Sequence, residues 1–172
     1  MIEQNLPVPL KNTCAYQLGV GAKPDFQKLY IAPVVNETAN LPQAAALLTA
    51  KIRETLARDG RVTLVNNPAD ADATLTVRIS HYTRDSLMAQ QADTGLTRKF
   101  ALNLDTRATL TNNRENRDYF RDRPIRATRN IYLDNPARPD TYDTQLQAER
   151  QALPQLAETL AQSLKHTLLD TW

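Results

Sequence analysis

Two long stretches in which apolar and polar residues alternate constrain the fold of this chain more than any other feature. In the first, at 74–80, Leu75, Val77 and Ile79 alternate with threonine, arginine and serine. The second, at 99–110, has an apolar set made of Phe100, Leu102, Leu104, Ala108 and Leu110. A period of two residues is typical of a β-strand with one buried and one solvated face. Because a polar loop at 83–97 separates the stretches, we expect two long antiparallel strands.

Two amphipathic segments can cover the apolar face of such a sheet. A helix is predicted from Pro42 to Asp59, where apolar residues recur every three or four positions, and Gly60 ends it. A second apolar stripe starts after Asp143, with Pro154 inside it, and this proline should kink the helix or divide it in two. The apolar residues of the second stripe are Leu146, Leu153, Ala157, Leu160, Leu164 and Leu168.

Shorter strands are predicted at 29–35 and 62–65. The segment 119–133 is also extended, but Pro124 interrupts it, so we expect an edge strand or a loose hairpin there. Together these elements predict an α+β fold with a mostly antiparallel sheet of four to five strands and two helices packed on one face. We expect an irregular N-terminal segment at 1–25 and a single α+β domain at 26–172.

Composition places the chain among ordinary globular proteins and excludes several other classes. Of its 172 residues, 23% are charged and 41% are hydrophobic. A mean hydropathy of -0.51, with no apolar run near the length that spans a bilayer, argues against a transmembrane helix. The net charge of +2 is too small to indicate nucleic-acid binding by itself. Residues 1–13 lack the basic start and apolar core of a secretory signal peptide.

No constellation of residues indicates catalysis or a metal site. The single cysteine, Cys14, excludes an internal disulfide and a cysteine-based zinc site, and the two histidines, His81 and His166, lie far apart in the sequence. His81 is predicted at a strand end and has no nucleophile motif around it. Asp70 and Asp72 could bind a cation, but turn chemistry explains them equally well. We therefore expect no enzyme, no cofactor and no metal.

An arginine-rich segment at 114–138 is the main candidate for ligand binding. The segment contains seven arginines and four acidic residues, so its formal net charge is +3. Arginine holds phosphate through two parallel hydrogen bonds, and interleaved aromatic residues could add stacking. The segment could bind an anionic amphiphile or single-stranded nucleic acid, or its charges could only keep an edge strand soluble and unpaired. The arginines are Arg114, Arg117, Arg121, Arg123, Arg126, Arg129 and Arg138.

The order of several segments resembles the LptE family of lipopolysaccharide-assembly lipoproteins, from Cys14 to the C-terminus. Cys14 to Gly19 resembles the start of a mature bacterial lipoprotein. The strand and turn at 29–38, a helix, the strand at 62–65, the acidic link at 69–72 and two long strands follow in the order of that family. The segment at 132–136, Tyr-Leu-Asp-Asn-Pro, closes the order before a terminal helix.

The resemblance implies a non-enzymatic outer-membrane lipoprotein on the periplasmic side. Such a protein plugs the β-barrel partner LptD and binds lipopolysaccharide, partly through basic residues. Carried over to this chain, the candidate lipopolysaccharide-binding residues are Arg121, Arg123, Arg126 and Arg129. Cys14 is the implied lipid-attachment residue, although Lys11, Asn12 and Thr13 before it depart from the small and apolar residues of a lipobox. The alternative function is a single-stranded nucleic-acid-binding domain that uses the arginine-rich segment.

Overall fold

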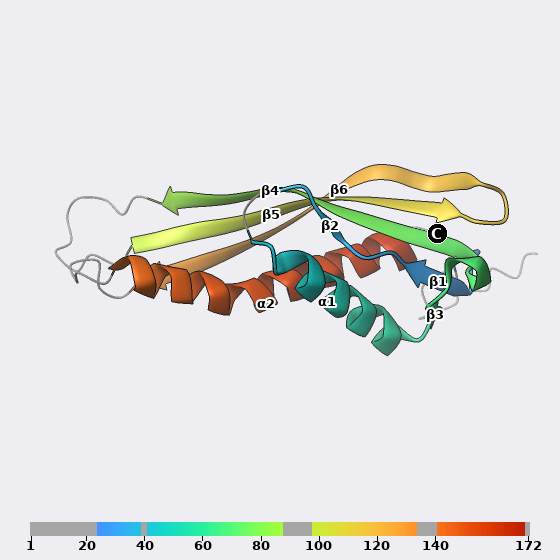
Figure 1. The fold of residues 1–172 in the computed structure, drawn as a ribbon, viewed down its shortest axis with the longest axis horizontal. Coiled ribbons are helices and arrows are strands. Elements are labelled where there is room, and N and C mark those ends of the chain that lie inside the picture. Colours follow the sequence, from blue (N-terminus) through green and yellow to red (C-terminus); the bar gives the residue numbers. More distant parts are fainter. Residues whose placement is uncertain (1–23, 39–40, 88–97, 134–140, 171–172) are drawn as a thin grey trace, which may run out of the picture.

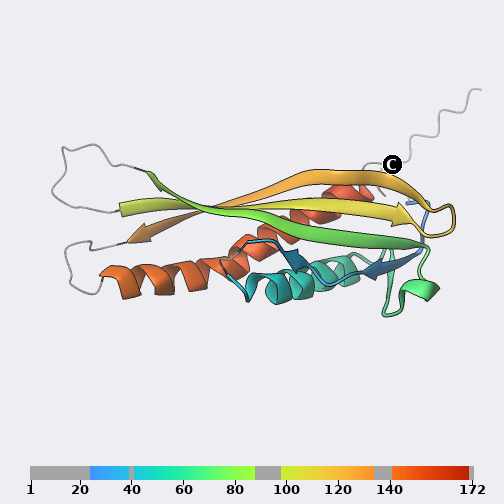
Figure 2. The same cartoon turned by 45° about the horizontal axis from the view of Figure 1, so that its top comes forward.

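A six-stranded mixed sheet with two helices on one of its faces makes up the protein (Figure 1, Figure 2). The computed structural model describes residues 24–38, 41–87, 98–133 and 141–170. Cys14 and Arg138 lie outside the described residues. The elements are β1 (Lys28–Ile31), β2 (Val35–Asn36), α1 (Ala44–Asp59), β3 (Thr63–Val65), the short 3-10 helix η1 (Pro68–Asp70), β4 (Ala73–Leu87), β5 (Arg98–Asn112), β6 (Arg117–Leu133) and α2 (Thr141–Leu169).

The strands lie in the order β3-β1-β4-β5-β6, and β2 pairs with β4 beyond the end of β1. The three long strands β4, β5 and β6 pair antiparallel, as the alternating stretches predict. The short strands β1, β2 and β3 pair parallel to their neighbours, so the expected mostly antiparallel sheet of four to five strands is corrected to a mixed sheet of six. The reason is the helical crossover α1, which carries the chain back along the sheet.

The strand predicted at 29–35 is two separate strands. β1 ends at Ile31, Pro33 follows in the connection, and β2 begins at Val35. Proline has no backbone N–H to donate to a neighbouring strand, so the ladder stops around it. Both short strands line the same edge of β4, where Ala32 N donates to the Leu75 carbonyl at 3.0 Å.

The long strand β4 continues well past the predicted end at position 80. A register shift between Ile79 and His81 leaves Ser80 as an extra residue, a β-bulge. After the bulge the alternation of side chains is shifted by one residue. The side chain of Tyr82, and not that of His81, therefore lies on the same face of the sheet as Ile79. His81 lies inside the strand, and its predicted strand-end position is wrong. The predicted loop at 83–97 is correspondingly shorter, because β4 extends to Leu87.

The strand β6 forms one edge of the sheet over its 17 residues, which confirms the edge strand expected around Pro124. Pro124 is opposite Arg107 of β5 in the register. It has no backbone N–H, and at the edge of the sheet there is no outer strand to which such a group would donate. Just before it, Asp122 adopts a positive φ of 49°, which aspartate tolerates better than most residues. The local register of β6 shifts around this residue.

The helices bury apolar side chains against one face of the sheet. Leu48 and Ile52 of α1 and Leu156 and Leu160 of α2 are fully buried. Gly60 ends α1 with φ +73°, the left-handed conformation typical of a helix C-terminus. α2 is not divided at Pro154: it runs through the proline as one helix of 29 residues and changes direction along its length (Figure 2). No helix in the described residues is both long and apolar enough to cross a membrane.

Candidate ligand-binding surface

One face of the sheet is not covered by any described helix, and we call it the open face (Figure 2). Alternate residues of β5 point toward the helices and are buried, so the residues between them belong to the open face. The side chains on this face are almost all polar. They include Thr74, Thr76 and Arg78 of β4, Asn103, Asp105, Arg107, Thr109 and Thr111 of β5, and Arg126, Thr128 and Asn130 of β6.

Hydrogen bonds between side chains cross the open face from strand to strand. Thr128 of β6 donates to Asn103 of β5 at 2.7 Å, and Asn103 donates to Asp85 of β4 at 2.7 Å. The guanidinium of Arg126 donates to both carboxylate oxygens of Asp105. The face is therefore a hydrophilic surface whose groups already hold one another in place.

The four predicted lipopolysaccharide-binding arginines share one strand but not one face. Arg126 lies opposite Asp105 on the open face. Arg123 and Arg129 instead lie opposite β5 residues that are buried beneath the helices, although both arginines are exposed at the sheet edge. Arg121 belongs to the irregular segment where the register of β6 shifts. The structure therefore brings Arg123 and Arg129 to one side of the edge and Arg126 to the other.

The four arginines also differ in how far their charge is offset. Arg121 donates to Asp118 at 2.6 Å, and the hydrogen bonds from Thr111 and Arg121 lower the pKa of that carboxyl. The guanidinium of Arg123 lies 5.7 Å from the centre of the Phe120 ring. Arg129 makes no hydrogen bond or ion pair with the described residues. Among the described residues, Arg123 and Arg129 are thus the two of the four that form no ion pair with a carboxylate.

The aromatic residues of β6 are partly used by the fold. The Tyr119 ring packs against the buried Phe26 at a centroid distance of 5.8 Å, and its hydroxyl accepts from Asn112 at 2.9 Å. Burial raises the pKa of the Tyr119 phenol. Phe120 is partly buried and lies under Arg123. The rings of Tyr119 and Phe120 are therefore poorly placed to stack on nucleic-acid bases, which need an exposed aromatic face, whereas Tyr132 is exposed.

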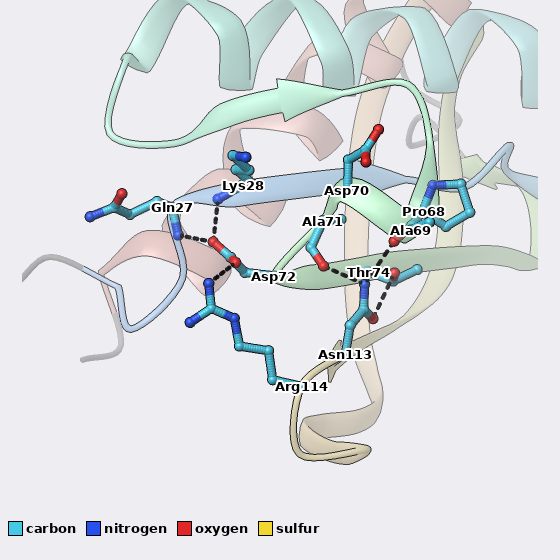
Figure 3. A pocket seen from close by; sticks show the side chains of 10 residues that line it. All are labelled: Gln27, Lys28, Pro68, Ala69, Asp70, Ala71, Asp72, Thr74, Asn113 and Arg114. Carbon is cyan, nitrogen blue, oxygen red and sulfur yellow. Dashed lines mark hydrogen bonds and ion pairs between the residues drawn. The ribbon is translucent and has the colours of Figure 1, made fainter.

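A shallow depression of about 680 Å³ lies where β1 and β4 begin, beside the β5–β6 turn (Figure 3). Asp72 is its centre: one carboxylate oxygen accepts from the backbone N–H groups of Gln27 and Lys28 at 3.0 and 2.9 Å, and the other pairs with Arg114 at 2.5 Å. The hydrogen bonds to the backbone are the main reason that the pKa of Asp72 lies below its ordinary value.

The predicted cation site at Asp70 and Asp72 lies in the same depression. Both oxygens of Asp72 are occupied by donors, and the Asp70 side chain points away from it (Figure 3). Asn113 closes the junction by donating to the carbonyls of Pro68 and Ala71 at 3.3 and 2.9 Å. Within the described ranges, no group of three or more His, Cys, Asp or Glu side chains could hold a metal ion. The Asp72 carboxylate therefore links the start of β1 to the β5–β6 turn, and the Asp70 side chain takes no part in this junction.

Within the part of the chain that the structure describes, His81 belongs to no catalytic arrangement. It is exposed on the open face opposite Asp105, and it makes no hydrogen bond with the described residues. The neighbouring Ser80 hydroxyl donates to the Asp105 carbonyl at 3.2 Å instead of to a base. Sequence reasoning missed Arg107 and Asp105 at this place, because only the register of the sheet brings them beside His81 and Arg126.

Comparison with one solved structure supports the fold. The chain is similar to the hypothetical protein CT253 from Chlamydia trachomatis, with a TM-score of 0.56, 9% identity, and coverage of 82% of this chain and 94% of that one. It is also similar to a minor lipoprotein from Acinetobacter baumannii (TM-score 0.48, 16% identity, coverage 83% and 95%). The rare lipoprotein B from Shewanella oneidensis gives a TM-score of 0.47 at 15% identity, with coverage of 82% and 96%.

Sequence comparison identifies the family. No curated protein matches the chain. The family model described as LptE, lipopolysaccharide-assembly, matches residues 26–168, from the residue that packs under Tyr119 to the last turn of α2. This range contains every described strand and nearly all of both helices. The chain therefore belongs to the LptE lipopolysaccharide-assembly family.

Proposed function

We propose that this protein is a non-enzymatic subunit of lipopolysaccharide assembly that binds lipopolysaccharide and plugs the outer-membrane β-barrel LptD from the periplasmic side. The observation that carries the proposal is the family match over residues 26–168. Two features of the surface support it: the open polar face of the sheet, and Arg123 and Arg129 at its edge, which pair with no described carboxylate. Lipid attachment at Cys14 is part of the same proposal.

The polar side chains of the open face are compatible with a hydrated, polar surrounding such as the lumen of a large β-barrel. Interior walls of wide outer-membrane barrels are polar, and residues pointing inward alternate with those facing lipid. Side chains such as Thr128, Asn103 and Asp85 are already ordered by their mutual hydrogen bonds. A partner that docks on them loses little conformational entropy, because the groups are held before contact.

Arg123 and Arg129 are the best candidates for holding the phosphates of lipopolysaccharide. Neither forms an ion pair with a described carboxylate, whereas Arg121 and Arg126 are held by Asp118 and Asp105. A phosphate that binds Arg121 or Arg126 competes with the existing carboxylate partner. Binding at Arg123 or Arg129 carries no such cost, so these two should contribute more to affinity.

The ligand part of the proposal is tested by measuring lipopolysaccharide binding to the purified protein and to Arg123→Gln/Arg129→Gln. We expect the double variant to bind at least about 10-fold more weakly, since the loss of even one charge-assisted hydrogen bond of roughly 1.5–3 kcal/mol corresponds to that factor or more. Arg150→Gln, which removes an exposed arginine from α2, is the matched control and should bind like the wild type. Unchanged affinity of the double variant would remove the edge arginines from the proposal.

The partner part is tested by purifying the protein from envelope extracts. Co-purification with a large outer-membrane β-barrel is expected, and polar-to-bulky substitutions on the open face, such as Thr128→Trp, should weaken it. A substitution of similar size at exposed Thr159 of α2 is the control. Recovery of a stable protein with no barrel partner would contradict the plug role. Mass spectrometry of the same preparation tests acylation of Cys14.

A further inference from the structure

Two arginines lie directly opposite each other on the open face. Arg78 of β4 pairs with Arg107 of β5 in the strand register. Like charges at directly opposed positions destabilise a sheet. Arg78 is compensated, because it pairs with Asp122 and lies 3.3 Å from Glu37. Arg107 is exposed and forms no ion pair or hydrogen bond with any described residue.

On its other side Arg107 faces a proline. Pro124 of β6 is its register partner, and proline has no side-chain acceptor to offer. Arg107 is therefore flanked by a cation on one strand and an apolar ring on the other. A sheet that retains an uncompensated charge in such surroundings breaks a rule of cross-strand pairing, and such exceptions in natural proteins concentrate at functional sites.

The surface is hollowed at this place. A depression of about 340 Å³ is lined by His81, Asp105, Arg107, Pro124 and Arg126, together with the bulged Ser80. The bulge interrupts the regular pleat of β4 on one side, and Pro124 provides only a short ring on the other. A depression of this size lies at the lower end of small-molecule sites and is too small for a whole lipopolysaccharide.

The charges around the depression favour an anion. The carboxylate of Asp105 lines it, but both its oxygens accept hydrogen bonds from Arg126, so its charge is locally offset. The Ser80 hydroxyl is directed to the Asp105 carbonyl at 3.2 Å. What remains is the guanidinium of Arg107, and the His81 ring also lines the depression.

We propose that this depression binds a phosphate group, with Arg107 as its principal ligand. Guanidinium binds phosphate through two parallel hydrogen bonds, which suits a residue with no competing carboxylate. The site is separate from the edge arginines, because Arg123 and Arg129 lie opposite buried residues whereas Arg107 lies on the open face. The inference rests on the proposed function only in taking the phosphate to be that of a lipopolysaccharide sugar.

Replacing Arg107 should change phosphate affinity and thermal stability in opposite directions. Arg107→Thr should weaken phosphate binding by about 10-fold or more. The same change should raise the melting temperature by about 1–4 °C, because it removes the repulsion with Arg78 and threonine favours strands. Arg107→Lys keeps the positive charge but cannot form the two parallel hydrogen bonds of a guanidinium. It should therefore bind phosphate with intermediate affinity and show little increase in melting temperature. A residue with a purely structural role would not lose binding while stability rises.

The experiment compares wild type, Arg107→Thr, Arg107→Lys, the control Arg150→Thr and the edge variant Arg123→Gln/Arg129→Gln. Binding of glucosamine 1-phosphate, inorganic phosphate and glucosamine is followed by amide chemical shifts, and lipopolysaccharide binding is measured in parallel. Saturable shifts around Ser80, Arg107 and Arg126 with both phosphates but not with glucosamine are expected. Tighter binding of the sugar phosphate indicates a glycolipid source, and equal binding indicates a site for free phosphate.

The proposal is overturned if Arg107→Thr binds glucosamine 1-phosphate as tightly as the wild type, or if the shifts lie away from the open face. Failure of the two proposals can be told apart. Loss of lipopolysaccharide binding in the edge variant alone, with Arg107→Thr unaffected in every assay, keeps the proposed function and removes the open-face site. If the wild type binds phosphate but not lipopolysaccharide, and Arg107→Thr loses the phosphate binding, the open-face site is kept and the proposed function is removed.

Discussion

Arg84 of β4 pairs with Glu149 of α2 at 2.5 Å, across 65 positions of sequence. The contact exists because the bulge at Ser80 turns Tyr82 and Arg84 toward the helices, where the Tyr82 hydroxyl also lies 3.5 Å from Glu149. The Glu149 side chain is only 11% exposed. The N-terminal half of α2 is thereby attached to the far half of the long strands, which α1 does not reach (Figure 1).

Replacing Arg84 tests this attachment. We expect Arg84→Gln to lower the free energy of unfolding by about 1 kcal/mol, because it removes the guanidinium that pairs with a largely buried carboxylate. A double-mutant cycle with Glu149→Gln should give a coupling of roughly 0.5–1 kcal/mol by urea denaturation. The control is Arg58→Gln, whose pair with Glu54 is on the surface, with Arg58 72% exposed, and should cost less. Additive effects of Arg84→Gln and Glu149→Gln would contradict the attachment.

Asp72 should contribute to stability more than its neighbour Asp70. We expect Asp72→Asn to lower the free energy of unfolding by about 1–3 kcal/mol, since it loses charge-assisted hydrogen bonds from two backbone N–H groups and Arg114. Asp70→Asn, at an exposed position in η1, should have little effect. Equal effects of the two substitutions in urea denaturation would show that the junction does not depend on the Asp72 carboxylate.

The same carboxylate predicts a pH dependence. The pKa of Asp72 in the folded state is below its ordinary 3.8, so the folded state binds this proton less readily than the unfolded chain. Its contribution is fully present above pH 3.8 and is lost as the pH falls through the lower folded pKa. The stability difference between wild type and Asp72→Asn should therefore shrink below about pH 4. A difference that stays constant down to pH 2 would contradict this origin.

Tyr82 should affect stability at alkaline pH. Burial, with the nearby Glu149 carboxylate, raises the pKa of its phenol from 10.0 to about 12. The folded state therefore favours the neutral phenol, and that contribution is lost as the pH rises from 10 toward 12. Tyr82→Phe should flatten the fall in stability over this range, as measured by denaturation at each pH. Tyr132→Phe is the control, because Tyr132 is 57% exposed.

Gly60 at the end of α1 isolates a purely conformational effect. Its φ is +73°, and a Cβ placed there would meet nothing within 4 Å. Gly60→Ala should therefore cost about 1 kcal/mol from backbone strain alone, without a steric clash. Gly60→Asn should recover part of the loss, since asparagine adopts this conformation more readily. Thermal unfolding of the two variants measures the difference, and equal stability of alanine and glycine would contradict the capping role.

The sequence predicted those elements whose pattern is repeated and local. The alternation of Leu75, Val77 and Ile79 indicated the first long strand and its buried face. Gly60 and the apolar residues before it indicated α1, and Pro124 indicated an edge strand. In each case the information lies within a few residues, because a strand or helix shows its buried face through its own period. The arginines of β6 were named as candidates from their density and from the family resemblance, and their role in binding stays a prediction.

Tertiary structure decided which face each residue serves. Nothing in the local pattern marked Ser80 as an extra residue, and one such residue moves every following side chain to the other face. The register of β5 with β6 then separated Arg126 from Arg123 and Arg129, and placed Arg107 between Arg78 and Pro124. Pairing across strands depends on contacts between residues far apart in the sequence. The sequence by itself therefore determined the elements and their polarity, and only the sheet decided which charges meet.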